Sequence, residues 1–178
     1  EKKLFQDVQM MEIYPIMKLN LRGKKREFMS AVGKSLNLLL PTESNTSTRS
    51  NTLTALWLSP DEWMIFSNEK IDIVSNEYKT EILLMNKISK INLGAVTDVT
   101  DQFVLINLKG NKIYELFQTG SPYNFNNFKK KKGAVTQTIL AKIDVIIHNQ
   151  ELNNVNLFVR RSFSQHLYSW MGDSASRL

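Results

Sequence analysis

Two apolar runs near the C-terminal end of the chain constrain its fold more than any other feature. The segment TQTILAKIDVIIHNQ alternates apolar and polar residues with the period of a half-buried β-strand. The apolar run VNLFVRR follows after only a few polar residues, a spacing that is typical of a β-hairpin. The alternating apolar positions of the first run are Ile139, Ala141, Ile143, Val145 and Ile147.

Strands and helices are mixed along the rest of the chain. TALWL, WMIF and FVLINL predict strands, and four segments carry apolar residues at helical spacing. The helical segments are REFMSAVGKSLNLLL, NEYKTEILLMNKISKI with its stripe Tyr78, Ile82, Met85 and Ile88, NKIYELFQTG, and RSFSQHLYSWMGD with its stripe Phe163, Leu167, Trp170 and Met171. Hairpins without strict strand–helix alternation favour an α+β fold in a single compact domain. A loose twofold repetition of strand–helix–strand units, divided near Gly94, is compatible with this order.

Length and composition limit the number of domains and the kinds of chemistry that the chain can carry. Its 178 residues fit one domain or two small halves that share a core. We assign one domain to residues 21–178, after an N-terminal arm at residues 1–20. Residues 41–52 are polar and aperiodic, and predict a long loop. The absence of cysteine excludes disulfides and thiolate metal sites. Because no segment has the apolar length of a signal peptide core or a membrane span, we expect a soluble cytoplasmic protein that does not bind membranes.

The formal net charge of +6 raises the possibility of a nucleic-acid partner. The basic clusters are RGKKR at residues 22–26, KKKK at 129–132, and the pair Arg160 and Arg161. The lysine run follows Tyr123 and Phe125, which could stack on bases. No helix-turn-helix, RNP motif or zinc-ligand set accompanies these clusters. We therefore predict solvated surface loops and no nucleic-acid binding.

The segment ALWLSPDEWMIF places two carboxylates between two tryptophans. Ser59 and Glu62 have the spacing of a helix capping box, and Pro60 suits a first helical position. The carboxylates then lie on a tight turn between two strands. Catalytic carboxylates need partners that shift their pKa or bind a substrate, and this segment has no histidine, cysteine or metal-ligand set. We predict a structural turn, with Trp57 and Trp63 as core or interface anchors.

Other motifs that could carry chemistry are incomplete. AVGKS resembles the end of a phosphate-binding loop, but Phe28 stands where that loop needs its first glycine. His148 and His166 have no partners at a recognised zinc spacing. Asp98 and Asp101 lack the rest of a calcium loop. From the residues alone we expect an α+β domain with no catalytic, cofactor-binding or metal-binding residues.

Several longer segments together resemble the gamma subunit family of heterotetrameric sarcosine oxidase. They are LRG, AVGKSLNLLLPTESNT, ALWLSPDEWMIF, VTDVTDQFVLINLKGNKIYELFQTGSPYNF, GAVTQTILAKIDVIIHNQ and LFVRRSFSQHLYSWMGD. The most specific parts are the Leu-x-Pro-Asp-Glu-Trp block and the Arg-Ser-Phe block that precedes Trp170. One departure is Ser121, where the family commonly has cysteine between glycine and proline.

The resemblance implies a fold similar to the folate-binding domain of aminomethyltransferase. It also implies a complex with alpha, beta and delta subunits that bind NAD, tetrahydrofolate, FAD, covalent FMN and zinc, while this chain binds none of them. Such a complex oxidises sarcosine to glycine, with hydrogen peroxide and formaldehyde or methylene-tetrahydrofolate as the other products. The role implied for this chain is that of a non-catalytic assembly subunit.

An assembly role predicts contact residues and leaves alternatives open. Interfaces are rich in aromatic residues and arginine at their centre, so we expect contacts from the exposed members of one set: Trp57, Trp63, Tyr123, Phe125, Arg160 and Arg161. The arm at 1–20 and the loop at 41–52 are further candidates, which we expect to become ordered on assembly.

Two alternative functions remain open. One is a subunit of a related dehydrogenase that acts on another N-methyl amino acid, such as N-methylglutamate or dimethylglycine. The other is a free-standing folate-binding transferase-like protein.

Overall fold

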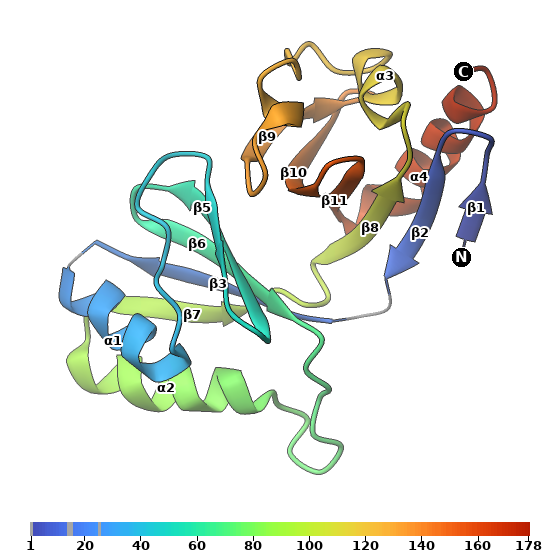
Figure 1. The fold of residues 1–178 in the computed structure, drawn as a ribbon. Helices are drawn as coiled ribbons and strands as arrows, with labels where there is room; N and C mark the ends of the chain where they lie inside the picture. Colours follow the sequence, from blue (N-terminus) through green and yellow to red (C-terminus); the bar gives the residue numbers. More distant parts are fainter. Residues whose placement is uncertain (1, 14–15, 25) are drawn as a thin grey trace. The chain divides into compact units, whose positions relative to one another are not determined.

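The computed structural model describes residues 2–13, 16–24 and 26–178. The chain divides into two compact units, one of residues 16–100 and one of residues 1–15 together with 101–178. In each unit an antiparallel β-sheet packs against helices (Figure 1). The predicted α+β class is therefore confirmed. The division into units is finer than the expected domain over residues 21–178, and the expected arm at 1–20 contributes strands to both units.

The described residues of the unit 16–100 form a five-stranded sheet with the order β4-β5-β6-β3-β7. All its neighbouring strands are antiparallel. The elements of this unit are β3 (Met17–Gly23), α1 (Arg26–Leu36), β4 (Ser47–Arg49), β5 (Leu53–Ser59), β6 (Glu62–Ser67), α2 (Lys79–Ile91) and β7 (Gly94–Asp98). The long loop predicted at 41–52 is interrupted by β4, which pairs with β5.

The second unit contains a six-stranded antiparallel sheet with the order β1-β2-β8-β11-β10-β9. Its elements are β1 (Lys2–Leu4), β2 (Gln9–Ile13), β8 (Phe103–Lys109), α3 (Ile113–Gln118), the 3-10 helix η1 (Phe128–Lys130), β9 (Val135–Leu140), β10 (Ile143–Glu151), β11 (Asn154–Arg160) and α4 (Arg161–Ala175). Strand β2 comes from the start of the chain, yet it lies inside this sheet beside β8 (Figure 1).

The two units repeat one topology. In the first, β3-α1-β5-β6-α2-β7 is a β-α-β-β-α-β unit of the split βαβ type, with β4 added at one edge. In the second, β8-α3-β10-β11-α4 follows the same order, with β9 added at the corresponding edge. Strand β2 takes the place that β7 has in the first unit, next to the first strand of the motif. The repetition expected from the sequence is present, but the division falls after Thr100 and not at Gly94.

The core of the unit 16–100 lies between its sheet and its two helices. Phe28 and Val32 of α1 and Leu84 and Ile88 of α2 are fully or almost fully buried there. The predicted helix at α2 is confirmed, but its predicted stripe is partly wrong because Ile82 and Met85 are exposed. The segment ILLM offers two neighbouring apolar stripes at helical spacing, and tertiary packing selects the one that contains Leu84.

The core of the second unit combines α3, α4 and one face of the six-stranded sheet. Leu116 and Phe117 of α3 pack in the same cluster as Leu167 and Met171 of α4. The predicted stripe of α4 is confirmed at these two residues. It is wrong at Phe163, which lies in the first turn of α4 and is about half exposed.

The segment predicted as one alternating strand folds as two strands. The strands β9 and β10 pair through Leu140 and Ile143, so that Ala141 and Lys142 form a two-residue turn. Both turn residues have positive φ, 51° and 66°, which is the pattern of a type I′ turn. The prediction missed this turn because its usual signal, Asn-Gly or Asp-Gly, is absent. The hairpin predicted between IDVIIHNQ and VNLFVRR is confirmed as β10 and β11.

The turn at Ala141–Lys142 leads to a stability prediction. Lys142 is exposed and has a left-handed backbone conformation, which costs about 1–2 kcal/mol for a residue with a Cβ atom. We expect Lys142→Gly to raise the free energy of unfolding by about 0.5–1 kcal/mol, because glycine removes this cost while its own loss of chain entropy offsets part of the gain. Urea denaturation measures the change. Lys142→Ala keeps the Cβ atom and is the matched control, so an equal gain in both variants would contradict the turn argument.

Candidate functional site

The carboxylates of the segment LSPDEW lie on the hairpin between β5 and β6. Pro60 and Asp61 form the turn, and no helix begins here, so the predicted capping box is wrong and the predicted tight turn is confirmed. The Ser59 hydroxyl donates a hydrogen bond to Asp61 Oδ1 over 2.7 Å. This bond is the main reason why the pKa of the Asp61 carboxyl lies below its ordinary value, with smaller contributions from the charges of Arg22 and Lys24.

The second carboxylate of this segment, that of Glu62, binds side chains of the neighbouring strand β3. Asn20 Nδ2 donates to Glu62 Oε1 over 2.7 Å. Arg22 Nη2 lies 3.1 Å from Glu62 Oε2 and forms an ion pair with it. Asn20 and Arg22 lie on β3 at the positions opposite Met64 and Glu62 in the β3–β6 register. Both carboxylates of LSPDEW are therefore used in contacts that hold this sheet together.

The two tryptophans of this region differ in exposure. Trp63 is 1% exposed and stacks on Phe28, with their ring centroids 6.3 Å apart. Its indole N–H donates to the Pro41 carbonyl over 2.8 Å, which attaches the start of the loop at 41–52 to β6. Trp57 lies opposite Trp63 in the β5–β6 register but is only half-buried. Trp63 is thus a core residue, and only Trp57 has surface to offer to a partner.

A cluster of aromatic rings surrounds the second pair of candidates, Tyr123 and Phe125. Phe125 is fully buried, whereas Tyr123 is 36% exposed and packs edge to face on Phe125, with ring centroids 4.9 Å apart. Phe128, Tyr114 and Phe117 also belong to this cluster. Burial raises the pKa of the Tyr114 hydroxyl to about 12, so this hydroxyl stays neutral at physiological pH.

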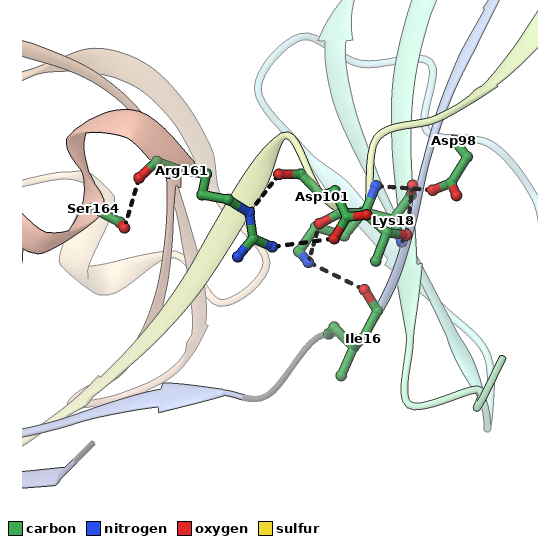
Figure 2. A network of polar contacts seen from close by, with 7 residues as sticks. Ile16, Lys18, Asp98, Asp101, Arg161 and Ser164 are labelled. Atoms are coloured by element: carbon green, nitrogen blue, oxygen red, sulfur yellow. Dashed lines mark hydrogen bonds and ion pairs between the residues drawn. The ribbon is translucent and has the colours of Figure 1, made fainter.

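The two arginines at the end of β11 are both exposed but have different surroundings. Arg161 Nε donates to the Asp101 carbonyl over 2.6 Å, and Arg161 Nη2 lies 3.3 Å from the Asp101 carboxylate (Figure 2). The side chain of Arg160 lines a groove of about 560 Å³ on the same unit, together with Gln137, Asp144 and Phe158. Arg161 therefore binds a residue of its own chain, whereas Arg160 lies at an open groove.

A buried lysine in the unit 16–100 was not predicted from the sequence. Lys18 is 1% exposed, and its ammonium donates to the carbonyls of Ile16 and Thr100 over 3.1 and 3.3 Å (Figure 2). The Lys18 backbone N–H donates to Thr100 Oγ1 over 2.9 Å. In the sequence Lys18 reads as the polar member of an alternating strand, so no signal separated it from an exposed lysine.

The remaining charged and metal-ligating residues are dispersed. Within the described part of the chain, no three His, Asp or Glu residues are grouped so that they could hold a metal ion. His148 is buried in β10, and His166 is exposed on α4. In the lysine run, Lys132 pairs with Glu151 over 3.2 Å. Lys25 of the first basic cluster lies outside the described residues. Among the described residues no helix is long and apolar enough to cross a membrane.

The six candidate contact residues therefore fall into three pairs, one in the unit 16–100 and two in the other unit. Trp57 and Trp63 pair across one hairpin of the unit 16–100. Tyr123 and Phe125 belong to the aromatic cluster of the other unit, where Arg160 and Arg161 mark the end of β11. The four with exposed surface are Trp57, Tyr123, Arg160 and Arg161.

A family model decides the relationship of the chain to known proteins. The model described as "Sarcosine oxidase, gamma subunit family" matches residues 22–177. The chain belongs to the sarcosine oxidase gamma subunit family. A sequence search among curated proteins finds no match.

Solved structures add a likeness of fold. A chain of the heterotetrameric sarcosine oxidase from Corynebacterium sp. U-96, in complex with pyrrole 2-carboxylate, matches with a TM-score of 0.85 at 19% identity; the match covers 99% of this chain and 88% of that one. Two aspartate kinase structures match less well. The enzyme from Clostridium acetobutylicum has a TM-score of 0.47 at 10% identity, covering 94% of this chain and 33% of that one. The regulatory subunit from Thermus thermophilus has a TM-score of 0.44 at 6% identity, covering 98% and 99%.

The hydrogen bond at the β5–β6 turn yields a pH prediction. We expect Ser59→Ala to raise the pKa of the Asp61 carboxyl toward its ordinary value of 3.8, because the largest contribution that lowers the pKa is removed. An NMR titration of the side-chain carboxyl carbons measures it. Asp72 is the internal control, since the backbone N–H groups of Ser75 and Val74 lower its pKa and are unaffected by the change. An unchanged Asp61 pKa would show that the Ser59 contact does not form in solution.

Proposed function

We propose that this chain is a non-catalytic accessory subunit of a flavin-dependent heterotetrameric sarcosine oxidase. Such an enzyme demethylates sarcosine oxidatively to glycine, with hydrogen peroxide and formaldehyde or methylene-tetrahydrofolate as the other products. The observation that carries the proposal is the family match over residues 22–177. The fold match to a chain of a heterotetrameric sarcosine oxidase over 99% of this chain supports it.

The distribution of polar groups supports a structural role. Glu62, Arg22 and Arg161 bind groups within this chain, as does the buried ammonium of Lys18. Catalytic acids and bases need a cleft in which burial and neighbouring charges shift their pKa toward the working pH. The pKa of Asp61 moves in the other direction, and the pKa of Tyr114 rises to about 12. The pKa of Glu81 on α2 is raised, first by partial burial and then by the charge of Asp98, so its neighbour is a like charge and not a catalytic partner. In the proposed complex FAD, FMN, NAD, tetrahydrofolate and zinc are bound by the alpha, beta and delta subunits, in the cytoplasm.

The proposed contacts with these subunits come from four residues. Trp57, Tyr123, Arg160 and Arg161 keep exposed surface, and Arg160 lines the groove described above. Trp63 and Phe125 are enclosed in the cores of their own units, so we exclude them from the proposed contacts. Exposed aromatic and arginine side chains are the residue types that contribute most to interface free energies.

Two alternatives differ from the proposal in their ligand or substrate. A subunit of a related N-methyl amino acid dehydrogenase would share the fold and the assembly role, because the substrate site lies on another subunit. A free-standing folate-binding protein would fit the proposed likeness to the folate-binding domain of aminomethyltransferase. Titration of the isolated chain with tetrahydrofolate tests the second alternative, and a comparison of sarcosine, N-methylglutamate and dimethylglycine as substrates of the complex tests the first.

The proposed role predicts the result of omitting the chain. We expect the other three subunits, co-expressed with this chain, to give a yellow complex that releases peroxide from sarcosine. Without the chain the yield of intact complex should fall at least about tenfold, since an obligate interface of standard size is left exposed. Mass photometry and flavin absorbance measure assembly, and peroxide release measures activity. A fully assembled and active three-subunit enzyme would contradict the proposal.

The proposed contact at Arg160 is testable by charge reversal. We expect Arg160→Glu to weaken assembly about tenfold or more, because like charges then meet across a surface that is complementary to arginine. Surface plasmon resonance on the immobilised partner subunits measures the dissociation constant. Lys129→Glu makes the same change of charge at an exposed residue of η1 and is the control. Equal affinities for both variants and the unchanged chain would exclude Arg160 from the contact.

A further inference from the structure

The connection between β6 and α2 is an insertion that the repeated topology does not need. It runs through residues 68–78, leaving the sheet of its unit before it turns back to α2 (Figure 1). At the corresponding place in the other unit, β11 ends at Arg160 and α4 begins at Arg161. The second unit therefore makes the same strand-to-helix connection with no intervening residue. Surface loops added to a scaffold in this way commonly carry function.

Hydrogen bonds within this connection hold its shape. Asp72 Oδ1 accepts from the backbone N–H groups of Val74 and Ser75, both over 2.9 Å. Across the loop, the Asp72 N–H donates to the Glu77 carbonyl over 3.0 Å. At its base, the Glu69 carboxylate accepts from the Thr80 N–H over 3.1 Å, which joins the start of the loop to the first turn of α2. The loop is thus ordered by its own contacts.

These bonds display apolar side chains at the tip of the loop. Ile73 is 94% exposed and Val74 is 97% exposed, and the neighbouring Ile71 is 40% exposed. Isoleucine and valine have few side-chain rotamers, so burying them against a partner costs little conformational entropy. On the first half of α2, Leu83 and Met85 are also exposed, by 41% and 47%. Apolar side chains as exposed as those of Ile73 and Val74 are the kind of surface that marks an interaction site.

The charges around the tip favour a protein partner over a lipid surface. Residues 69–79 carry three carboxylates, at Glu69, Asp72 and Glu77, and two lysines, although the whole chain has a net charge of +6. An anionic membrane selects apolar side chains accompanied by an excess of basic residues, whereas in this segment the carboxylates outnumber the lysines by one. A pocket on a protein that is apolar inside and basic at its rim is complementary to this tip.

We propose that residues 71–74 insert into an apolar pocket, rimmed by basic groups, on another subunit of the oxidase. This inference rests on the proposed function. The loop acts as a preformed plug. Such a contact joins this chain to its partner through the unit 16–100, independently of Arg160 and Tyr123, which lie on the other unit.

The test uses the full-length chain and the other subunits of its own oxidase. The double variant Ile73→Ser/Val74→Ser keeps the backbone bonds of the loop and removes both apolar side chains. We expect it to weaken binding to the immobilised partner subunits on the order of 100-fold, from the loss of two buried aliphatic side chains. Leu152→Ser is the matched control, because Leu152 is 78% exposed on the turn between β10 and β11. Circular dichroism and thermal unfolding check that both variants are folded like the unchanged chain.

The outcomes separate this inference from the proposed function. Loss of binding in the folded double variant, with normal binding in Leu152→Ser, supports the plug. Equal binding by both variants and the unchanged chain overturns the plug and leaves the accessory role standing. An unchanged chain that binds no partner subunit overturns both. Two further results would overturn the plug, because the tip would then bind something other than a partner subunit. One is self-association of the unchanged chain in sedimentation velocity, absent in the double variant. The other is co-sedimentation of the unchanged chain with phosphatidylserine vesicles, absent in the double variant.

Discussion

The pairing of β2 with β8 is the contact on which the arrangement of this chain depends. It joins residues 9–13 to residues 105–109, so that the start of the chain completes a sheet whose other central strands follow residue 100. Met10 is fully buried in the resulting core, and its carbonyl accepts a hydrogen bond from the Tyr168 hydroxyl of α4 over 3.2 Å. The backbone at Gly110, just after β8, lies close to the backbone at Asp7, just before β2. A Cβ atom at Gly110, whose φ is +138°, would lie 2.0 Å from the Asp7 carbonyl oxygen. Only glycine accommodates both this φ and this contact.

This pairing also explains why two similar halves form from an uninterrupted chain. Between β2 and β8 the chain runs through a complete copy of the topology at residues 16–100. Described residues next to the unit boundaries make polar contacts within their own units. Ile16 and Thr100 accept hydrogen bonds from the Lys18 ammonium, and Asp101 accepts hydrogen bonds from Arg161. Ile16 and Thr100 are thus attached to the unit 16–100, and Asp101 is attached to the other unit. The repeated topology in turn identifies residues 68–78 as an addition to a fold that is complete without them.

The candidate site was predictable only in part, and the reason is physical. The residue types were the expected ones for an interface, but a pattern of aromatic residues does not distinguish a core from a surface. Trp63 and Phe125 fill cores, whereas Trp57 and Tyr123 retain exposed surface. The exposed tip at Ile73 and Val74 could not be predicted, because the apolar residues of IDIV are typical of a short strand or a buried segment. Its exposure depends on the turn that Asp72 forms with the following N–H groups, and such a turn becomes visible only in three dimensions.

The sequence by itself determined the α+β class, the positions of most strands and helices, and the absence of thiol chemistry, because these follow from the local periodicity of apolar residues and from composition. The motifs that resemble the sarcosine oxidase gamma subunit family are likewise a property of the linear chain. Only the tertiary structure decided which apolar stripe of α2 and which face of α4 are buried, where the two units divide, and that the first strands close the last sheet. Those outcomes depend on contacts between residues that are far apart in sequence, and local propensity carries no information about such contacts.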